Sequence, residues 1–177
     1  MILVVAATEQ ELAGASGVST LACGIGPVEA AAATSRALAQ LKPAAVLHVG
    51  IAGARTIPAP DLVIGSQAVY EDADGGLVRK HARPDPDLVE AARRALPEAH
   101  VLPIGTSARV GGTSGCDIEA MEGFAVLRAA ELAGIPALEV RAVSNEIDEP
   151  DRGRWRFDDA LAALAAALPR LLAELQE

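Results

Sequence analysis

The chain has 177 residues and a net charge of −9 at pH 7, and 51% of its residues are hydrophobic although only 2% are aromatic. This length suits one domain whose core is built from aliphatic side chains. The negative charge argues against nucleic acid or an anionic membrane as a partner, because both require a positively charged face.

The apolar run at residues 1–7 is expected to form a buried strand and not a secretory signal, since it lacks a basic start and is too short. No apolar run reaches the length of a bilayer span. Cys23 and Cys116 have neither a C-x-x-C spacing nor a nearby set of histidines. The sequence therefore predicts a cytoplasmic protein with reduced, mostly buried thiols, no metal site and no cofactor.

Strands and helices are predicted to alternate along the whole chain. Apolar runs bounded by turn residues predict strands, and the helical segments carry start and stop signals such as Pro27 and Gly134. In chain order, strands are expected at 1–7, 18–24, 44–54, 61–72, 100–110 (one or two strands) and 136–144, and helices at about 27–41, 84–96, 121–133 and 157–176. This order predicts one α/β domain over 1–177, a three-layer αβα sandwich with a mostly parallel, mixed sheet.

Five polar or glycine-rich clusters follow the predicted strands or open a predicted helix: Glu9–Glu11, 24–26 (GIG), 50–54 (GIAGA), 119–123 (EAMEG) and 141–145 (RAVSN). Each has a purely structural explanation, because carboxylates favour helix starts, glycine permits tight turns, and Ser or Asn can open a turn. The alternative is a ligand site, since α/β proteins bind ligands at the carboxyl ends of their strands.

Taken in order, these fragments resemble the nucleoside phosphorylase and nucleosidase superfamily. The segments AATEQEL, CGIGPVEAA, VGIAGA, APDLVIGSQAVYEDAD, EAMEGFA and VRAVSN are each similar to a motif of that family, and together they cover nearly the whole chain. Asn145, where adenine-specific members carry aspartate, and the DRGRW sequence that follows it are similar to the futalosine hydrolase branch. The resemblance implies a nucleoside phosphorylase-like fold and hydrolysis of futalosine to hypoxanthine and dehypoxanthine futalosine in menaquinone biosynthesis.

The implied reaction cleaves a purine N-glycosidic bond through a ribosyl oxocarbenium-like state. By resemblance Glu11 positions and activates the water, and Arg141 lines the same end of the site; a carboxylate can accept a proton and favour the developing cation. Glu122 matches the family carboxylate that binds the ribose hydroxyls, and Met121 packs against the sugar. The remaining residues of the expected substrate-binding set are Gly26, Gly50, Ile51 and Ser144.

Asn145 is expected to recognise the departing base. A carboxamide has both a donor and an acceptor, so its NH₂ group can bond to the 6-oxo group while its oxygen accepts from a protonated N7. It cannot supply the proton itself. With Glu11 and Arg141, Asn145 completes the expected catalytic set.

Three alternatives remain open at this point. A phosphorylase needs a cationic phosphate site, but His48 and Ile51 stand where phosphate-using relatives carry Arg and Ser. A methylthioadenosine/adenosylhomocysteine nucleosidase is disfavoured by Asn145. A non-catalytic nucleotide-binding domain is disfavoured because the G-x-G-x-x-G spacing is absent.

No purine-stacking aromatic is evident: Tyr70, Phe124 and Trp155 could serve or belong to the core, and Phe157 is expected to pack at the start of the last helix. The benzoate carboxylate of the implied substrate needs a cation. Arg152 or Arg154 could provide it, although a solvated surface position is the expected role of either. By analogy with relatives, the chain is expected to bind a small-molecule nucleoside as a homo-oligomer, a dimer or larger.

Overall fold

The structure is a computed structural model that describes residues 1–74, 76–113 and 115–176. In these residues the strands form one mixed sheet in the order β2-β1-β3-β7-β6-β4-β5, and β8 pairs with both β3 and β4. The strands are β1 (Ile2–Ala6), β2 (Ser19–Ala22), β3 (Ala45–Ala54), β4 (Leu62–Tyr70), β5 (His81–Ala82), β6 (His100–Thr106), β7 (Ile118–Ala120) and β8 (Ala137–Glu146).

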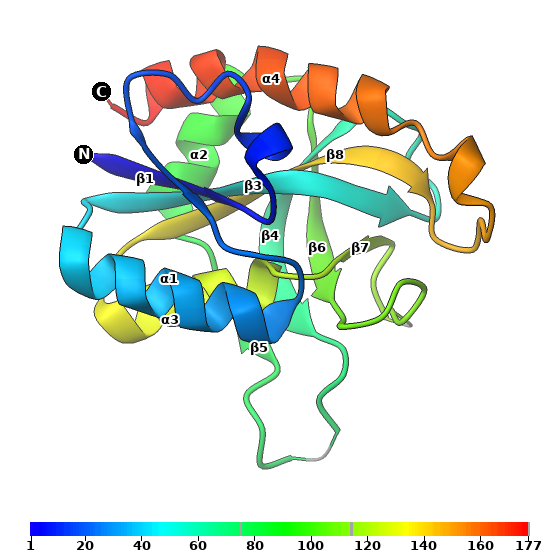
Figure 1. Cartoon of the computed structure of the whole chain (residues 1–177), viewed down its shortest axis with the longest axis horizontal. Helices are drawn as coiled ribbons and strands as arrows, with labels where there is room; N and C mark the ends of the chain where they lie inside the picture. Colours follow the sequence, from blue (N-terminus) through cyan, green and yellow to red (C-terminus); the bar gives the residue numbers. More distant parts are fainter. Residues whose placement is uncertain (75, 114, 177) are drawn as a thin grey trace.

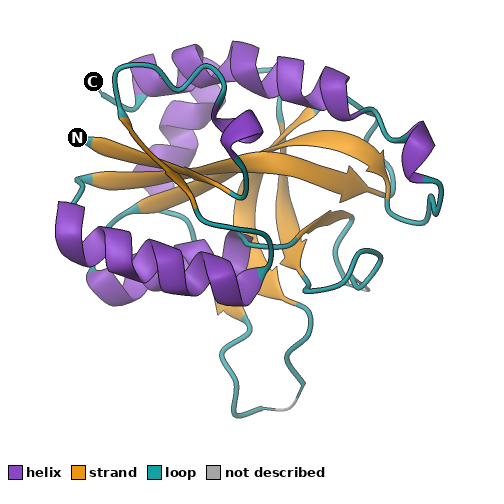
Figure 2. Ribbon diagram, in the orientation of Figure 1, coloured by secondary structure: helices purple, strands orange, loops and turns teal. Residues whose placement is uncertain are grey.

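Helices cover both faces of this sheet, so the three-layer αβα sandwich is confirmed. One pair of helices packs together on one face and the second pair on the other (Figures 1 and 2). The first pair is α1 (Pro27–Leu41) and α3 (Gly123–Ala133), and the second is α2 (Pro86–Ala95) and α4 (Phe157–Glu174). Two short 3₁₀ helices, η1 (Glu9–Leu12) and η2 (Arg152–Arg154), lie at strand ends.

The helix limits follow from local chemistry. Asp85 caps α2, because its carboxylate accepts from the backbone N–H groups of Asp87 and Leu88, and Pro86 occupies the first helical position. Gly134 ends α3 in the left-handed conformation, with φ 68°. The predicted helices are confirmed to within a few residues at each end.

The core is aliphatic, as the composition predicts. β1 and most of β3 are buried, and their side chains join α1 and α3 on one face and α2 and α4 on the other. The N-terminal apolar run is β1, as predicted. Cys23 and Cys116 are both buried and free. Within the described residues, no helix combines the length and apolar character needed to cross a bilayer.

Two details differ from the sequence interpretation. Residues 119–120 belong to the short strand β7, and α3 begins only at Gly123. β7 pairs with β6 in parallel and with β3 antiparallel. With three residues, it is too short to show a periodic pattern in the sequence. The two-residue strand β5 is also unpredicted.

β3 and β8 run parallel at the centre of the sheet, and their register places the site. Gly50 pairs with Arg141 and His48 with Glu139, so these four residues lie together across two strands. The register then shifts between Ala52 and Gly53, and Ser144 is left without a partner. This β-bulge lies at the carboxyl ends of both strands, the place where α/β folds bind ligands.

Candidate active site

A cavity of about 630 Å³ opens at the carboxyl ends of β3 and β8. This volume is within the range of small-molecule sites. Its wall comes from η1, β3, the β7–α3 connection, β8, η2 and the start of α4. The polar and charged side chains that line it are Thr8, Gln10, Glu11, Glu119, Glu122, Arg141, Ser144, Asn145, Arg152 and Asp158. These include the three predicted catalytic residues.

Glu11 lies in η1, where the chain leaves β1. Its Oε2 accepts from both the N–H and the hydroxyl of Thr8, at 2.9 and 2.8 Å, and its Oε1 accepts from the N–H of Ile51 at 3.0 Å. Both lone-pair positions of Oε2 are therefore used, while Oε1 keeps one. Because Glu11 lines the cavity, that position is available to a ligand or a water molecule.

Glu122 lies just before α3 and lines the same cavity as Glu11. Its Oε1 accepts from the N–H of Gly26 at 3.0 Å, and its Oε2 accepts from Arg141 at 3.4 Å. The carboxylate is 3% exposed, yet it lines the cavity. Each oxygen keeps one acceptor position, which suits a pair of neighbouring hydroxyl groups.

Arg141 is the centre of a buried ionic cluster, the name used here for Arg141, Glu139, Glu122, Glu11 and His48. Its Nε donates to Glu139 at 2.9 Å, and its Nη1 donates to the backbone oxygen of Ile51 at 3.3 Å. Burial disfavours the charge, but Glu139, Glu122 and Glu11 together raise the pKa of Arg141 above its ordinary value. The guanidinium therefore stays charged although it is only 1% exposed.

His48 is the neutral member of the cluster. Its Nδ1 lies 3.0 Å from the backbone oxygen of Val5, which only accepts, so Nδ1 carries the proton. Nε2 then accepts from Arg141 Nη2 at 2.5 Å. Burial, followed by the charge of Arg141, lowers the pKa of His48 well below its ordinary value. The ring is thus one more acceptor for the guanidinium.

Glu139 lies deepest in the cluster and is fully buried. Burial raises its pKa, against the opposing attraction of Arg141. A Cβ at Gly123 would overlap the Glu139 carboxylate, so the first residue of α3 is a glycine for steric reasons. Among described residues, Glu139 Oε2 lacks a hydrogen-bond partner.

Asn145 and Ser144 lie side by side on the cavity wall because of the β-bulge. The Ser144 hydroxyl is 2.8 Å from Asn145 Oδ1, and Asn145 Nδ2 donates to the Glu146 backbone oxygen at 2.9 Å. That carbonyl can only accept, so it determines which side of the carboxamide is NH₂. One N–H and one lone pair of Asn145 remain for a ligand.

The structure differs from the sequence interpretation in the part that two glycines play. Ile51 and Met121 line the cavity, as expected, but Gly26 and Gly50 do not. Gly26 supports Glu122 through its N–H. A Cβ at Gly50 would overlap the Arg141 guanidinium and lie 2.8 Å from Glu11 Oε1. Gly50 therefore makes room for the polar side chains of the site, and Gly26 donates its N–H to one of them.

The aromatic residues fall into two pairs. Tyr70 and Phe124 stack on each other with ring centroids 5.1 Å apart, and neither lines the cavity. Trp155 and Phe157, 5.3 Å apart, do line it. Phe157 was expected to pack at the start of the last helix; it packs against Trp155 there and also lines the cavity, with an exposure of 36%.

Sequence reasoning also missed the roles of His48 and Glu139. A polar residue within each of two strongly apolar runs was the available signal. Among the described residues, no group of three or more His, Cys, Asp or Glu side chains is placed to hold a metal ion.

We predict that Gly50→Ala lowers the free energy of unfolding by about 3 kcal/mol or more, because the added methyl group separates Arg141 from its buried carboxylates. Urea titration measures this. Gly76→Ala is the matched control, since a Cβ there meets nothing within 4 Å, and it should stay within about 0.5 kcal/mol of the parent. Parental stability of Gly50→Ala would contradict the steric role of this glycine.

Known proteins share both the sequence pattern and the fold. The family model described as the Phosphorylase superfamily matches residues 8–177. A futalosine hydrolase of Streptomyces coelicolor is 36% identical over 191 residues, covering 90% of this chain and 80% of that protein. One from Acidothermus cellulolyticus is 32% identical over 148 residues, covering 67% and 61%.

Solved structures agree at the level of the fold. The methylthioadenosine/S-adenosylhomocysteine nucleosidase of Streptococcus pneumoniae in complex with 8-aminoadenine has a TM-score of 0.85 at 22% identity, covering 97% of this chain and 98% of that chain. A futalosine hydrolase mutant of Helicobacter pylori has a TM-score of 0.85 at 18% identity, covering 99% and 97%. The nucleoside phosphorylase-like fold is thereby confirmed, and this chain belongs to the phosphorylase superfamily as a homologue of the futalosine hydrolases.

Proposed function

We propose that this protein hydrolyses the N-glycosidic bond of a 6-oxopurine nucleoside, and that its substrate is futalosine. The observation that carries the proposal is that Glu11, Glu122 and Asn145 line the same cavity, in a chain 36% identical to a futalosine hydrolase. The products are hypoxanthine and dehypoxanthine futalosine, which assigns the protein to menaquinone biosynthesis. A cytoplasmic location is part of the same proposal.

The nucleophile is a water molecule bound to Glu11 Oε1. Oε1 keeps the free lone pair, whereas the N–H of Ile51 and both donors of Thr8 hold the carboxylate still. As the C1′–N9 bond breaks, the water oxygen bonds to C1′ and its proton passes to Glu11. Preorganised groups of this kind lower the barrier because they need not reorient during the reaction.

The ribose is held by Glu122. Its two carboxylate oxygens accept from the 2′- and 3′-hydroxyls, and Met121 packs against the sugar. Three carboxylates surround the single guanidinium of the ionic cluster, so the pocket has an excess of negative charge. A cationic ribosyl group is favoured by that excess as it forms.

Asn145 stabilises the leaving base. Its free N–H donates to the 6-oxo oxygen, and its free lone pair accepts from N7–H; the proton on N7 comes from solvent, because a carboxamide is not an acid at neutral pH. Ser144 positions the carboxamide through its hydroxyl. A 6-amino group would instead bring a donor against the Asn145 donor, which disfavours methylthioadenosine as the substrate.

Phosphorolysis is the second candidate, and the cavity disfavours it. Among described residues, the cationic side chains that line the cavity are Arg141 and Arg152. Arg141 is already paired with Glu139 and Glu122, and His48 beside it is held neutral. A phosphate dianion next to Glu11 would meet repulsion from that carboxylate, and Arg141, the cation of the same cluster, is already paired.

We further propose a homo-oligomer. Ile25, Val28 and Val110 are exposed hydrophobic residues, and Ile25 and Val110 line the cavity. A second copy that covered these side chains would remove apolar surface from water.

We predict that futalosine releases hypoxanthine in phosphate-free buffer and leaves a free reducing sugar. Chromatography of the base and a reducing-sugar assay measure the two products, with inosine and methylthioadenosine as comparison substrates. A strict need for phosphate, or preferential cleavage of methylthioadenosine, would replace this proposal by one of its alternatives.

Glu11→Gln is expected to bind substrate with a similar Kd but to lower kcat about 100-fold or more, because an amide cannot take a proton from water. Rapid-quench measurement of base release gives kcat, and calorimetric titration gives Kd. Glu9→Gln is the control, since Glu9 is an exposed neighbour outside the cavity lining. If Glu11→Gln turned over at the parental rate, Glu11 would be only a helix-start carboxylate.

Asn145→Asp is expected to lower kcat/KM for futalosine sharply and to shift the preference toward its 6-amino counterpart. An ionised carboxylate has only acceptors, so it cannot donate to the 6-oxo oxygen of the base. It also cannot donate to the Glu146 backbone oxygen, which accepts from Asn145 Nδ2 in the parent protein. Discrimination by such sites reaches about 10⁴-fold. The test is the ratio of kcat/KM for the two substrates; an unchanged ratio would remove the base-recognition role of Asn145.

A further inference from the structure

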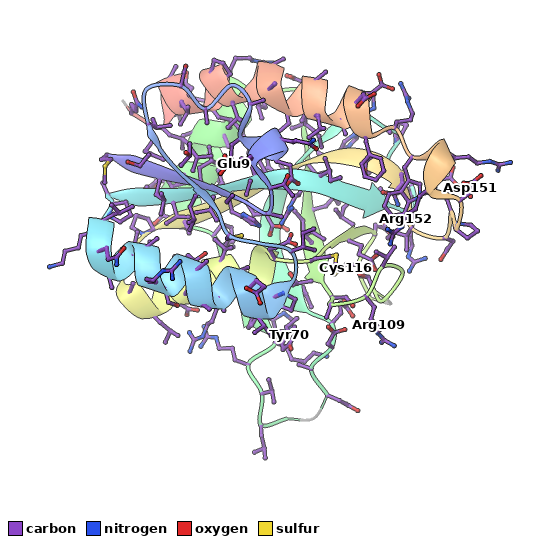
Figure 3. The ribbon with its side chains drawn as sticks, in the orientation of Figure 1. Glu9, Tyr70, Arg109, Cys116, Asp151 and Arg152 are labelled. Atoms are coloured by element: carbon purple, nitrogen blue, oxygen red, sulfur yellow. The ribbon has the colours of Figure 1, made fainter. Side chains whose placement is uncertain are left out.

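The outer wall of the cavity is formed by η2 and the start of α4, and it is chemically different from the inner end. It consists of Arg152, Trp155, Phe157, Asp158 and Leu161. The inner end carries the carboxylates and the ionic cluster, whereas the outer wall presents two aromatic rings and a guanidinium. Arg152 is the first residue of η2, and in Figure 3 it is labelled beside the carboxyl end of β3.

The two aromatic rings of the outer wall are held in fixed positions. Trp155 Nε1 donates to the backbone oxygen of Glu149 at 3.1 Å. The rings of Trp155 and Phe157 pack at 45° with centroids 5.3 Å apart. Tilted packing of this kind is a favourable aromatic geometry. The two rings therefore form an apolar surface against which a planar aromatic group of a ligand can pack.

Arg152 differs from its neighbours in lacking an acidic partner. Arg154 pairs with Glu149 at 3.3 Å, and Arg156 pairs with Asp159 at 2.8 Å. In the described part of the chain, no carboxylate lies within ion-pair distance of Arg152, and its contact is with the face of the Trp155 ring, 5.6 Å from the centroid. A cation on an aromatic face keeps its planar hydrogen-bonding edge available.

The rest of the cavity cannot balance a negative charge on a ligand. Arg141 is neutralised by its own carboxylates, and Glu11, Glu119 and Glu122 would repel an anion. Asp158 also lines the outer wall. It lies in the first turn of α4, where a carboxylate interacts favourably with the helix dipole. An anionic ligand group is therefore directed to Arg152.

We infer that Arg152, with Trp155 and Phe157, binds an aromatic carboxylate at the 5′ end of the nucleoside. This inference rests on the proposed function and adds the residues that select the 5′ substituent. The aromatic ring packs against the surface formed by Trp155 and Phe157, while the guanidinium of Arg152 donates two hydrogen bonds to the carboxylate. Of the two arginines that the sequence offered for this carboxylate, we choose Arg152, because it lines the cavity and Arg154 does not.

The test compares futalosine with its methyl ester, which keeps the ring but removes the charge. Arg152→Gln should lower kcat/KM for futalosine about 10- to 100-fold, the effect of one lost charged hydrogen-bonding pair, and mainly through KM. The ester should lose much less, so the preference for the acid over the ester should collapse. Arg152→Lys should restore part of the preference.

Arg154→Gln is the matched control. It removes the same charge two positions along the chain, from a side chain that does not line this cavity. It should leave the acid-to-ester ratio unchanged. An equal fall in both variants, or an unchanged ratio in Arg152→Gln with an active parent enzyme, would overturn this inference alone. Failure of the parent enzyme to cleave either compound would overturn the proposed function as well.

Discussion

The contact between the Arg141 guanidinium and its three side-chain acceptors determines where most of the site residues lie. Glu139, Glu122 and His48 each take a hydrogen bond from this one buried cation, while Glu11 approaches it across Gly50. A charge of this kind costs several kcal/mol to bury unless it is paired. Once the charge is buried, the carboxylates are required, and their geometry follows from the two strands that carry them.

The same cluster connects stability with chemistry. Its carboxylates outnumber its cations, which is unfavourable for an empty, dry pocket but favourable for a ligand that becomes positively charged as it reacts. His48 adds an acceptor without adding charge, because burial and Arg141 keep it neutral. Glycine at positions 50 and 123 makes the space that the side chains occupy. Polar residues that look misplaced in apolar strands are thus explained by one another.

The fold could be predicted because its signals are local. Apolar runs, Pro27 and Gly134 define strands and helices within short windows. The strand-end rule pointed to the clusters that contain Glu11, Arg141 and Asn145, and the resemblance to the nucleosidase superfamily selected these residues from them. The pairing of His48 with Glu139 and of Gly50 with Arg141 depends on the register between strands about 90 residues apart. No local pattern carries that information, so the partners of Arg141 and the steric role of Gly50 were not foreseen. The aromatic wall was predicted only in part: Trp155 was a candidate for the site, whereas Phe157 was expected only to pack, because the position of η2 beside the cavity has no local signal.

The β-bulge at Ser144 interrupts the alternation of side chains between Arg141 and Asn145. In a regular strand, successive residues point to opposite faces of the sheet, so two consecutive side chains do not face the same cavity. Here, two consecutive residues face the same cavity, beyond the last regular pairing that holds Arg141 in place. The residue proposed to bind the base, Asn145, is thus separated by the bulge from the regular pairing that holds Arg141. Under the proposed role of Asn145, a single substitution beyond the bulge would change the purine specificity while the buried ionic cluster stayed unchanged.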